Sequence, residues 1–304
     1  MAKTVVVVGA TGGQGGSVIS ALLGRPGIHI RGITRNIHSP KAQTLAAKGV
    51  EMVTADLDNE STLAKAFEGA SVIWAVTDFF EPFSKHGPEL AMEIEHNQGV
   101  NMARAASKTT TLEHYIWSTL ANPMKISNGK YLIPHFEELL KKTTFLWVTY
   151  FASNLLLPLF LPNKLESAGK YVWLQPTPPT TPVVAVGNQE KNVGIFVSAI
   201  LDHPELTLPG KFVRADTESL TKGELLEIWG RVTGKPTQYV QISLDDFDSL
   251  FPQWGREMGL MLKFWEEVGE KSWSGEEGIL SGNDLGVKYL EGVEEAFGHF
   301  DWNL

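Results

Sequence analysis

Short apolar runs recur along the first 150 residues, and stretches that read as helices separate them. Continuous apolar runs are typical of strands that are buried on both faces of a parallel sheet. Strands that alternate with helices indicate an α/β fold with a doubly wound sheet. The predicted strands lie within residues 5–8, 29–36, 50–59, 70–81, 114–120 and 145–151.

The second half of the chain has a different organisation. Residues 175–183 carry four prolines, which a helix interior or a central strand does not tolerate, so we expect a loop or a sheet edge there. Thr221, with Glu224 three residues later, predicts a capped helix start. We therefore predict a parallel-sheet domain over residues 1–153 and a smaller α+β lobe over residues 154–304. Some segments of that lobe are expected to return to the first domain.

One segment requires a test for membrane insertion. Residues 143–163 are uncharged, and the segment has roughly the length of a spanning helix. Pro158 and Pro162 interrupt it, and residues 145–151 are aromatic and β-branched, which favours a buried strand. The N-terminal residues lack the layout of a signal peptide. We expect a cytoplasmic protein that does not associate with membranes.

Composition argues against several classes of function. Hydrophobic residues at 43% and charged residues at 20% fit a globular protein, and the net charge of −9 argues against a nucleic-acid partner. The chain has no cysteine, which excludes disulfides, thiolate nucleophiles and cysteine-based zinc sites. The eight histidines show no paired ligand spacing, and the acidic C-terminal stretch is typical of a solvated face. We expect no metal site.

The first predicted strand runs into a glycine-rich turn, GATGGQG. Gly9, Gly12 and Gly15 stand at G-x-x-G-x-x-G spacing, and a helical pattern is established from Ser17. A helix N-terminus presents free N–H groups and a partial positive charge, and glycines let a pyrophosphate approach the backbone. Strand, turn and helix in this order therefore predict a dinucleotide site. A tight turn without a ligand is the structural alternative.

The second predicted strand ends at Thr34 and Arg35. An acid at this place binds the ribose 2′-hydroxyl of NAD, whereas an arginine suits a 2′-phosphate. Arg35 therefore predicts NADP(H) as the cofactor, and Lys41 could add positive charge. The structural alternative is that Arg35 is a solvated residue at a strand end.

Other strand ends supply further candidates, because ligands of such sheets bind outside the carboxyl ends of the strands. Asp56 follows the third strand, where an adenine edge would lie, and Thr77 ends the fourth strand. The predicted cofactor-binding residues are Gly9, Thr11, Gly12, Gln14, Gly15, Arg35, Asp56 and Thr77.

These segments resemble the NmrA-like family of atypical short-chain dehydrogenases. The resemblance covers nearly the whole chain and includes VVVVGATGGQGGSVISALL, RGITRN, HYIWSTL, PHFE, YFASNLL and ADTESLTKGEL. It implies a Rossmann domain that binds NAD(P) and a smaller C-terminal lobe over the cofactor. The family includes regulators, NADPH sensors, reductases and enzymes of specialised metabolism, so the resemblance leaves the activity open.

The usual proton-transfer pair of short-chain dehydrogenases is absent from the sequence. In the Tyr-x-x-x-Lys pair the lysine lowers the pKa of the tyrosine, but no tyrosine of this chain has a lysine four residues on. Catalytic members of the group that the chain resembles often carry H-F-x-x-K. Here Leu139 stands where that lysine would follow His135.

The remaining candidates for catalysis are Asp78, Ser118, Lys125, Tyr131 and His135. His135 has a pKa suited to proton transfer, and Tyr131 precedes it by four residues. In the structural alternative, His135 and Tyr131 belong to a loop over the cofactor, and Lys125 and Lys130 are solvated charges.

Aromatic residues gather in the stretches TDFFEPF, FLWVTYF, YVWLQP and LKFWEEV. Some must fill the core, and the others could line a pocket for a bulky, flat, apolar molecule. We therefore predict an NADP(H)-dependent enzyme of specialised metabolism that acts on a bulky hydrophobic substrate by hydride transfer, with a redox-coupled rearrangement or cyclisation as a variant. The alternative is a non-catalytic NADP(H)-sensing regulator that binds a protein partner.

Overall fold

The computed structural model describes residues 2–120, 141–252 and 254–304. The described chain forms two compact units. Unit 1 consists of Met1–Val148, Glu190–Ala215 and Glu276–Lys288, and unit 2 consists of Thr149–Gln189, Asp216–Gly275 and Tyr289–Leu304. Unit 1 therefore includes two segments from the second half of the chain.

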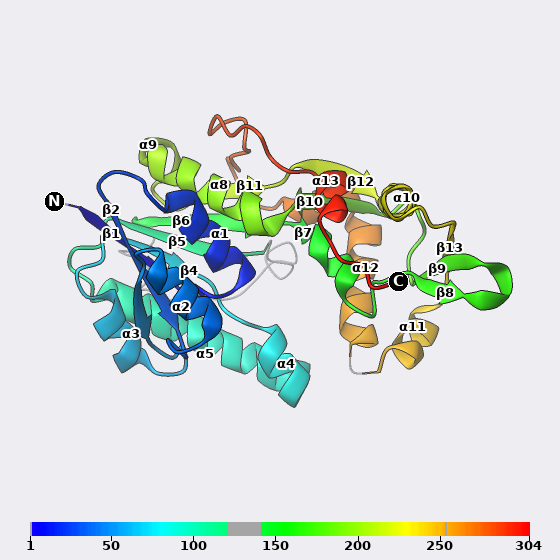
Figure 1. The fold of residues 1–304 in the computed structure, drawn as a ribbon, viewed down its shortest axis with the longest axis horizontal. Helices are drawn as coiled ribbons and strands as arrows, with labels where there is room; N and C mark the ends of the chain where they lie inside the picture. Colours follow the sequence, from blue (N-terminus) through cyan, green and yellow to red (C-terminus); the bar gives the residue numbers. More distant parts are fainter. Residues whose placement is uncertain (1, 121–140, 253) are drawn as a thin grey trace. The chain divides into compact units, whose positions relative to one another are not determined.

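A parallel sheet of seven described strands forms the centre of unit 1 (Figure 1). Its strands are β1 (Lys3–Val7), β2 (Ile28–Thr34), β3 (Glu51–Thr54), β4 (Val72–Ala75), β5 (His114–Thr119), β6 (Thr143–Val148) and β11 (Lys211–Ala215). They lie in the order β11-β6-β5-β4-β1-β2-β3. The predicted doubly wound α/β fold is confirmed, and β11 adds an edge strand beside β6 that comes from far along the chain.

Helices cover both faces of this sheet (Figure 1). They are α1 (Gly13–Leu22), α2 (Pro40–Ala47), α3 (Glu60–Phe67), α4 (Phe80–His86), α5 (Pro88–Ser107), α8 (Gln189–Asp202) and α9 (Pro204–Thr207). Helices α1 and α8 approach closely, because the backbone N–H of Gly194 donates to Ser17 Oγ at 2.8 Å. A Cβ at Gly194 would lie 2.2 Å from the Ser17 carbonyl oxygen, so this contact requires glycine.

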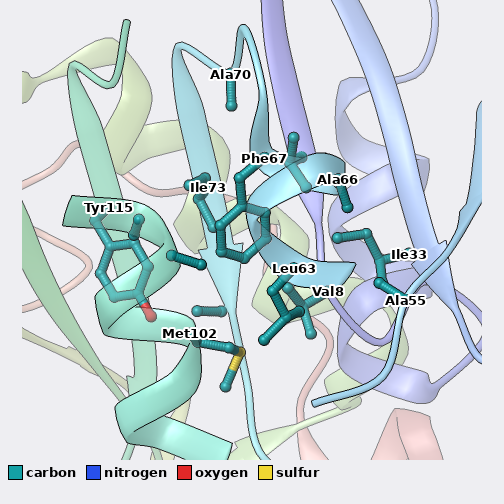
Figure 2. Packing of buried hydrophobic residues seen from close by; sticks show 14 of the residues in the cluster. Val8, Ile33, Ala55, Leu63, Ala66, Phe67, Ala70, Ile73, Met102 and Tyr115 are labelled. Carbon is teal, nitrogen blue, oxygen red and sulfur yellow. The ribbon is translucent and has the colours of Figure 1, made fainter. Parts of the chain in front are cut away.

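The core on the α3 and α5 side follows from strand alternation. Val6 and Val8 of the first strand region belong to one buried cluster with Leu63, Phe67 and Met102 from the helices, and Figure 2 shows Val8 beside Leu63. Val5 and Val7 are also fully buried, and alternation directs them to the opposite face. The apolar run at residues 5–8 is therefore buried on both faces, as the pattern predicts.

Unit 2 holds two small mixed sheets, in the orders β12-β10-β7 and β13-β9-β8. Its strands are β7 (Tyr150–Phe151), β8 (Asn163–Leu165), β9 (Lys170–Gln175), β10 (Pro182–Gly187), β12 (Glu218–Thr221) and β13 (Thr237–Gln241). Its helices are α10 (Lys222–Thr233), α11 (Leu244–Leu250), α12 (Gly255–Val268) and α13 (Val293–Gly298), with the 3-10 helices η2 (Ala152–Leu156), η3 (Glu166–Ala168) and η4 (Gly269–Trp273). Strand pairs of both directions, packed with helices, confirm the predicted α+β lobe.

The predicted helix cap at Thr221 is confirmed, and one prediction about prolines needs correction. Thr221 and Glu224 form a capping box at the start of α10. The proline-rich segment is a connection only over residues 176–181, because Pro182 begins β10, the central strand of its sheet. A proline at the first residue of a strand is tolerated.

Two other predicted strands differ in their ends. Strand β4 ends at Ala75 rather than at Thr77. The predicted strand at residues 145–151 is divided, since β6 belongs to the large sheet and β7 pairs with β10 in unit 2. In the described part of the chain, no helix combines the length and the apolar composition needed to cross a membrane.

Candidate functional site

The glycine turn joins β1 to α1, and two of its glycines are required by the protein's own geometry. Gly9 adopts a φ of +65°, in the left-handed region that favours glycine. A Cβ at Gly15 would lie 2.2 Å from the carbonyl oxygen of Gly9. The close contact between the turn and the first turn of the helix therefore excludes any side chain at Gly15.

Gly12 differs from Gly9 and Gly15, because the protein's own geometry does not require glycine there. Its φ is −87°, which any residue adopts, and the residue is exposed. A Cβ there would lie 3.3 Å from the carbonyl oxygen of Gly9, which is tight but permits a small adjustment. Packing within the chain therefore does not require a bare backbone at Gly12, whereas a ligand that approaches the turn does.

The N-terminal end of α1 has the free N–H groups and the positive potential that favour an anion. Gly12 is the N-cap, it provides no side-chain cap, and the first turn carries no acidic residue. Thr11 and Gln14 lie in the same short stretch, on either side of the helix start. The N-terminal end of α1 therefore presents backbone N–H groups and a partial positive charge beside the exposed Gly12.

Gln14 also connects the turn to a predicted catalytic residue. Ser118, near the end of β5, donates from Oγ to Gln14 Oε1 at 2.7 Å. Ser118 is only 6% exposed. The structure thus brings these two predicted site residues together, and it uses the hydroxyl proton of Ser118 to hold Gln14.

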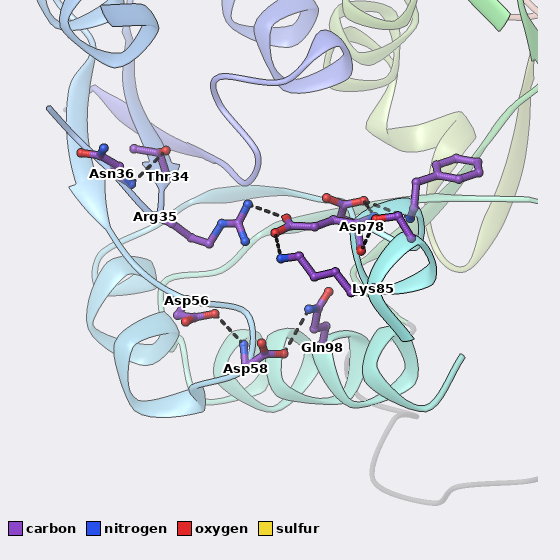
Figure 3. Close-up of polar contacts among 11 residues, drawn as sticks. Thr34, Arg35, Asn36, Asp56, Asp58, Asp78, Lys85 and Gln98 are labelled. Atoms are coloured by element: carbon purple, nitrogen blue, oxygen red, sulfur yellow. Dashed lines mark hydrogen bonds and ion pairs between the residues drawn. The ribbon is translucent and has the colours of Figure 1, made fainter. Parts of the chain in front are cut away.

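Arg35 follows β2 directly and is part of an ion-pair network that joins the end of β2 to helix α4 (Figure 3). Its Nη2 donates to Glu81 Oε2 at 2.6 Å, and Lys85 Nζ donates to the other oxygen, Oε1, at 2.7 Å. The Arg35 side chain is 67% exposed and that of Glu81 is 33% exposed. A solvent-accessible guanidinium therefore stands where the sequence predicts the 2′-phosphate contact.

The charges of this network hold each other ionised. The hydrogen bond from Arg35, followed by that from Lys85, lowers the pKa of Glu81 to about 2. The hydrogen bond with Glu81 raises the pKa of Arg35, and the charges of Asp78 and Asp56 act in the same direction. Arg35 is thus a cation that carboxylates surround.

The acidic residues after β3 form a smaller polar group near Arg35 (Figure 3). Asp56 Oδ1 accepts the backbone N–H of Asp58 at 3.1 Å, and Asp58 Oδ1 accepts Gln98 Nε2 of α5 at 3.0 Å. Asp56 is exposed, as a residue at an adenine edge would be. These bonds fix the loop after β3 against α5.

Thr77 and Asp78 lie in the connection between β4 and α4. Thr77 Oγ1 donates to Glu95 Oε1 of α5 at 2.7 Å. Asp78 Oδ1 accepts the backbone N–H groups of Phe80 and Glu81 at 3.1 and 3.2 Å. Asp78 therefore organises the start of α4, which positions Glu81 beside Arg35.

Three of the predicted catalytic residues, Lys125, Tyr131 and His135, lie outside the described residues, as does Lys130. Of the five catalytic candidates, the structure therefore describes only Asp78 and Ser118. Both make hydrogen bonds that support local structure.

Sequence reasoning missed Glu81 and Lys85. Their i, i+4 spacing in the helix after β4 is visible in the sequence, but the contact of Glu81 with Arg35 joins residues 46 positions apart. Lys41, the second cation that the sequence suggests, lies near the start of α2.

Sequence reasoning also missed a buried lysine in unit 2. Lys222, the first residue of α10, is 0% exposed, and its Nζ donates to Gln175 Oε1 at 2.7 Å. The ammonium group lies over the rings of Trp173 and Phe160, at 4.9 and 5.7 Å from their centroids. Burial lowers the pKa of Lys222 to about 7.

A group of possible metal ligands in unit 2 has a structural explanation. Glu291, which precedes α13, Glu295 within it and His299 at its C-cap come together. Glu291 is buried, and its Oε1 accepts Asn188 Nδ2 at 2.6 Å. This carboxylate therefore serves the packing between the end of β10 and the start of α13, while Glu295 and His299 are exposed.

Five of the eleven aromatic residues in these stretches fill the cores of their own units. Those with less than a tenth of their surface exposed are Phe83, Trp147, Tyr150, Tyr171 and Trp173. Phe80 differs, since it is 55% exposed and lies at the carboxyl end of the sheet, two residues after Asp78.

A seven-stranded parallel sheet with a glycine turn after β1 defines a Rossmann-type fold. The chain belongs to the NmrA-like family, whose family model matches residues 1–289. The predicted family is thereby confirmed.

Relatives with similar sequences carry the family name. An NmrA-like family domain-containing protein of Dictyostelium discoideum is 27% identical over 321 residues, covering 100% of both chains. The NmrA-like family domain-containing oxidoreductase cpsB of Aspergillus campestris is 29% identical over 278 residues, covering 83% of this chain and 79% of the relative.

Solved structures share the fold. The structure of NmrA, a negative transcriptional regulator, in complex with NADP has a TM-score of 0.71 at 21% identity, and the match covers 100% of this chain and 99% of that chain. The same regulator has been solved in complex with NAD.

Proposed function

We propose that this protein is an NADP(H)-dependent oxidoreductase of specialised metabolism that acts on a bulky hydrophobic substrate. The observation that carries the proposal is the pairing of an exposed Gly12, which packing within the chain does not require, with an exposed Arg35 at the end of the neighbouring strand. These are the two places where a doubly wound sheet receives a pyrophosphate and a ribose 2′-phosphate.

The residues of unit 1 fit such a cofactor. The turn from Gly9 to Gly15 and the N-terminus of α1 would hold the pyrophosphate, and Arg35 would hold the 2′-phosphate. Asp56 would lie along the adenosine, and Thr77 near the nicotinamide half. A bound nicotinamide supplies hydride transfer, so the protein's part is to orient the substrate and to manage its proton.

Named relatives support the oxidoreductase class. The Aspergillus relative is called an oxidoreductase, and so is malD of Malbranchea aurantiaca at 28% identity over 79% of this chain. We propose hydride transfer as the reaction, with a redox-coupled rearrangement or cyclisation as its variant. The exposed Phe80 offers an aromatic surface for a flat, apolar substrate.

Cofactor preference tests the proposal. In calorimetric titrations, NADP(H) is expected to bind at least about tenfold tighter than NAD(H), because Arg35 makes a charge-assisted contact only with the former. Arg35→Ala should reduce this difference by about 1.5–3 kcal/mol. Equal affinity of the wild type for both cofactors would refute the preference for NADP(H).

Turnover tests the enzymatic part. NADPH oxidation with a panel of bulky aromatic ketones, quinones and amides should reveal at least one substrate. Replacing the proton-transfer residue among Asp78, Ser118, Lys125, Tyr131 and His135 should lower kcat while NADPH affinity stays nearly unchanged. Activity that survives the replacement of all five would place the chemistry in other residues.

A second function is favoured by one observation. Asp78 and Ser118 both serve local structure, as they would in a protein that senses NADP(H) and binds a protein partner without catalysis. A sensor should bind NADPH and show no turnover with the panel. Its affinity for the partner should change with cofactor occupancy.

A further inference from the structure

Glu81 accepts hydrogen bonds from two cations, Lys85 and Arg35, and Arg35 is the residue predicted to contact the 2′-phosphate. Arg35 Nη2 lies 2.6 Å from one of its carboxylate oxygens, and Lys85 Nζ lies 2.7 Å from the other (Figure 3). The carboxylate thus offers two oxygens and one negative charge to two cations. A phosphate monoester offers the same kind of contact with three oxygens and a larger charge.

The surroundings make this arrangement more than a surface ion pair. Arg35 and Lys85 are 67% and 59% exposed, so a solute can reach both. Glu81 is more enclosed, at 33% exposure, and Asp78 holds its backbone N–H at the start of α4. The carboxylate is therefore anchored, and the two cations at its sides remain accessible.

We infer that Glu81 competes with the 2′-phosphate of the dinucleotide for Arg35 and Lys85 and so sets the strength of the preference for NADP(H) over NAD(H). The inference rests on the proposed function, because it requires a dinucleotide with its ribose at Arg35. A 2′-phosphate must share or break both ion pairs and lies close to a like charge, which lowers its affinity. NAD(H), whose 2′-hydroxyl is neutral, leaves both ion pairs in place.

The competing explanation is structural. Glu81 and Lys85 form an i, i+4 pair within α4, and such pairs stabilise helices. If this were their whole role, removing either partner would weaken α4 and shift the affinities for both dinucleotides in the same direction. Competition predicts that the two replacements change NADP⁺ affinity in opposite directions.

The experiment compares Glu81→Gln and Lys85→Met with the wild type in calorimetric titrations with NADP⁺ and NAD⁺ at fixed ionic strength. Glu81→Gln should tighten NADP⁺ binding by about fivefold, because one like charge leaves the phosphate site. Lys85→Met should weaken NADP⁺ binding by roughly two- to fivefold, since one cation is lost. NAD⁺ affinity should stay within about twofold in both variants.

Glu89→Gln is the matched control. Glu89 lies in the first turn of the neighbouring helix α5, is exposed, and is not among the carboxylates that raise the pKa of Arg35, so the replacement makes the same charge change outside this network. It should alter neither affinity by more than about twofold.

The outcomes separate this inference from the function on which it rests. A wild type that binds neither dinucleotide removes the proposed function and the inference together. If the wild type binds both dinucleotides and Glu81→Gln leaves NADP⁺ affinity unchanged or weaker, the inference is refuted and the proposed function stands. Equal tightening by Glu89→Gln would also overturn it, because the effect would then come from net charge.

Discussion

Two cations of this protein, Arg35 in unit 1 and Lys222 in unit 2, occupy opposite surroundings. Arg35 is two-thirds exposed and pairs with the carboxylate of Glu81. Lys222 is fully buried, donates to the neutral amide of Gln175, and lies over two aromatic rings. Carboxylates raise the pKa of the first, and burial lowers the pKa of the second to about 7.

The difference shows how the two units divide their tasks. At the strand ends of unit 1, charges remain in water, where a charged ligand can exchange for a charged partner at modest cost. In unit 2, Lys222 is part of the packing, where its charge has a desolvation cost. We therefore expect replacements at the unit 1 site to change binding, and replacements at Lys222 to change stability.

The largest expected effect tests the expectation that replacements at the unit 1 site change cofactor binding. Gly12→Val should weaken NADP(H) binding at least about a hundredfold, because the side chain would occupy the path of the pyrophosphate. The fold should persist, with a loss of no more than about 1–2 kcal/mol, since Gly12 has an ordinary φ and a tight but adjustable contact with Gly9. Titration and thermal unfolding measure the two quantities.

Gly16→Ala serves as the control for the turn. A Cβ there would make an ordinary contact, 3.8 Å from the Ala10 carbonyl oxygen, and alanine favours the helix. This variant should bind NADP(H) like the wild type. Normal binding by Gly12→Val would mean that the glycine turn holds no ligand.

The next largest effect tests the expectation that Lys222 affects stability. The unfolded chain keeps a proton on Lys222 up to about pH 10.5, whereas the folded chain keeps it only up to about pH 7. The folded state therefore binds fewer protons between these values, and the wild type gains stability as the pH rises through this window. Lys222→Met should remove this gain and stabilise the protein by about 2–3 kcal/mol near pH 7, after the lost bond to Gln175 is counted.

Lys170→Met is a matched control in the same unit. Lys170 also donates to an amide oxygen, that of Gln238 at 3.3 Å, but it is exposed. Its replacement should change stability by less than about 0.5 kcal/mol at any pH between 6 and 10. Denaturant titrations across this range measure both variants. Parallel curves for the wild type and Lys222→Met would contradict the prediction.

The smallest expected effect concerns His114, a buried histidine of unit 1, and it sharpens the comparison because a buried titratable group of unit 1 should also affect stability. His114 Nε2 lies 2.8 Å from Thr144 Oγ1, whose own proton goes to the Thr207 carbonyl, so the histidine is the donor. Burial, with a smaller contribution from Lys3, lowers the pKa of His114 to about 4. The wild type should therefore lose stability as the pH falls from about 6.5 to 4.

His114→Gln keeps a donor and removes the titration. Between pH 7 and 5 it should lose about 1–2 kcal/mol less stability than the wild type. His38→Gln, at an exposed position, should follow the wild-type curve. If His114→Gln also follows that curve, His114 contributes nothing to acid sensitivity.

Much of unit 1 could be predicted because its signals are local. The apolar run at residues 5–8 and the glycine turn specify a buried strand and a helix start within a few residues of each other. Strand β11 was harder to place, since Phe212 reads as part of a strand but its stacking on Phe145 of β6 depends on a distant segment. Pairing between segments far apart leaves no local pattern.

The residues of the candidate site also fall into those that local sequence predicts and those that depend on distant partners. Arg35 could be predicted because its place after β2 follows from chain order alone. The roles of Glu81 and Lys222 could not be predicted, since each side chain bonds to a partner more than 40 residues away in the sequence. A lysine at the start of a helix reads as a surface residue until its packing against Trp173 is known.

The late position of β11 has a consequence for synthesis. When the ribosome has released Val148, six of the seven strands exist, and β6 still has an unpaired edge that carries Phe145 and Trp147. At typical elongation speeds, roughly 3–13 s pass before residue 215 emerges and β11 can cover that edge. Unpaired apolar edges recruit other chains. Nascent or truncated polypeptides that stop before residue 211 should therefore depend on chaperones, whereas the finished chain should not.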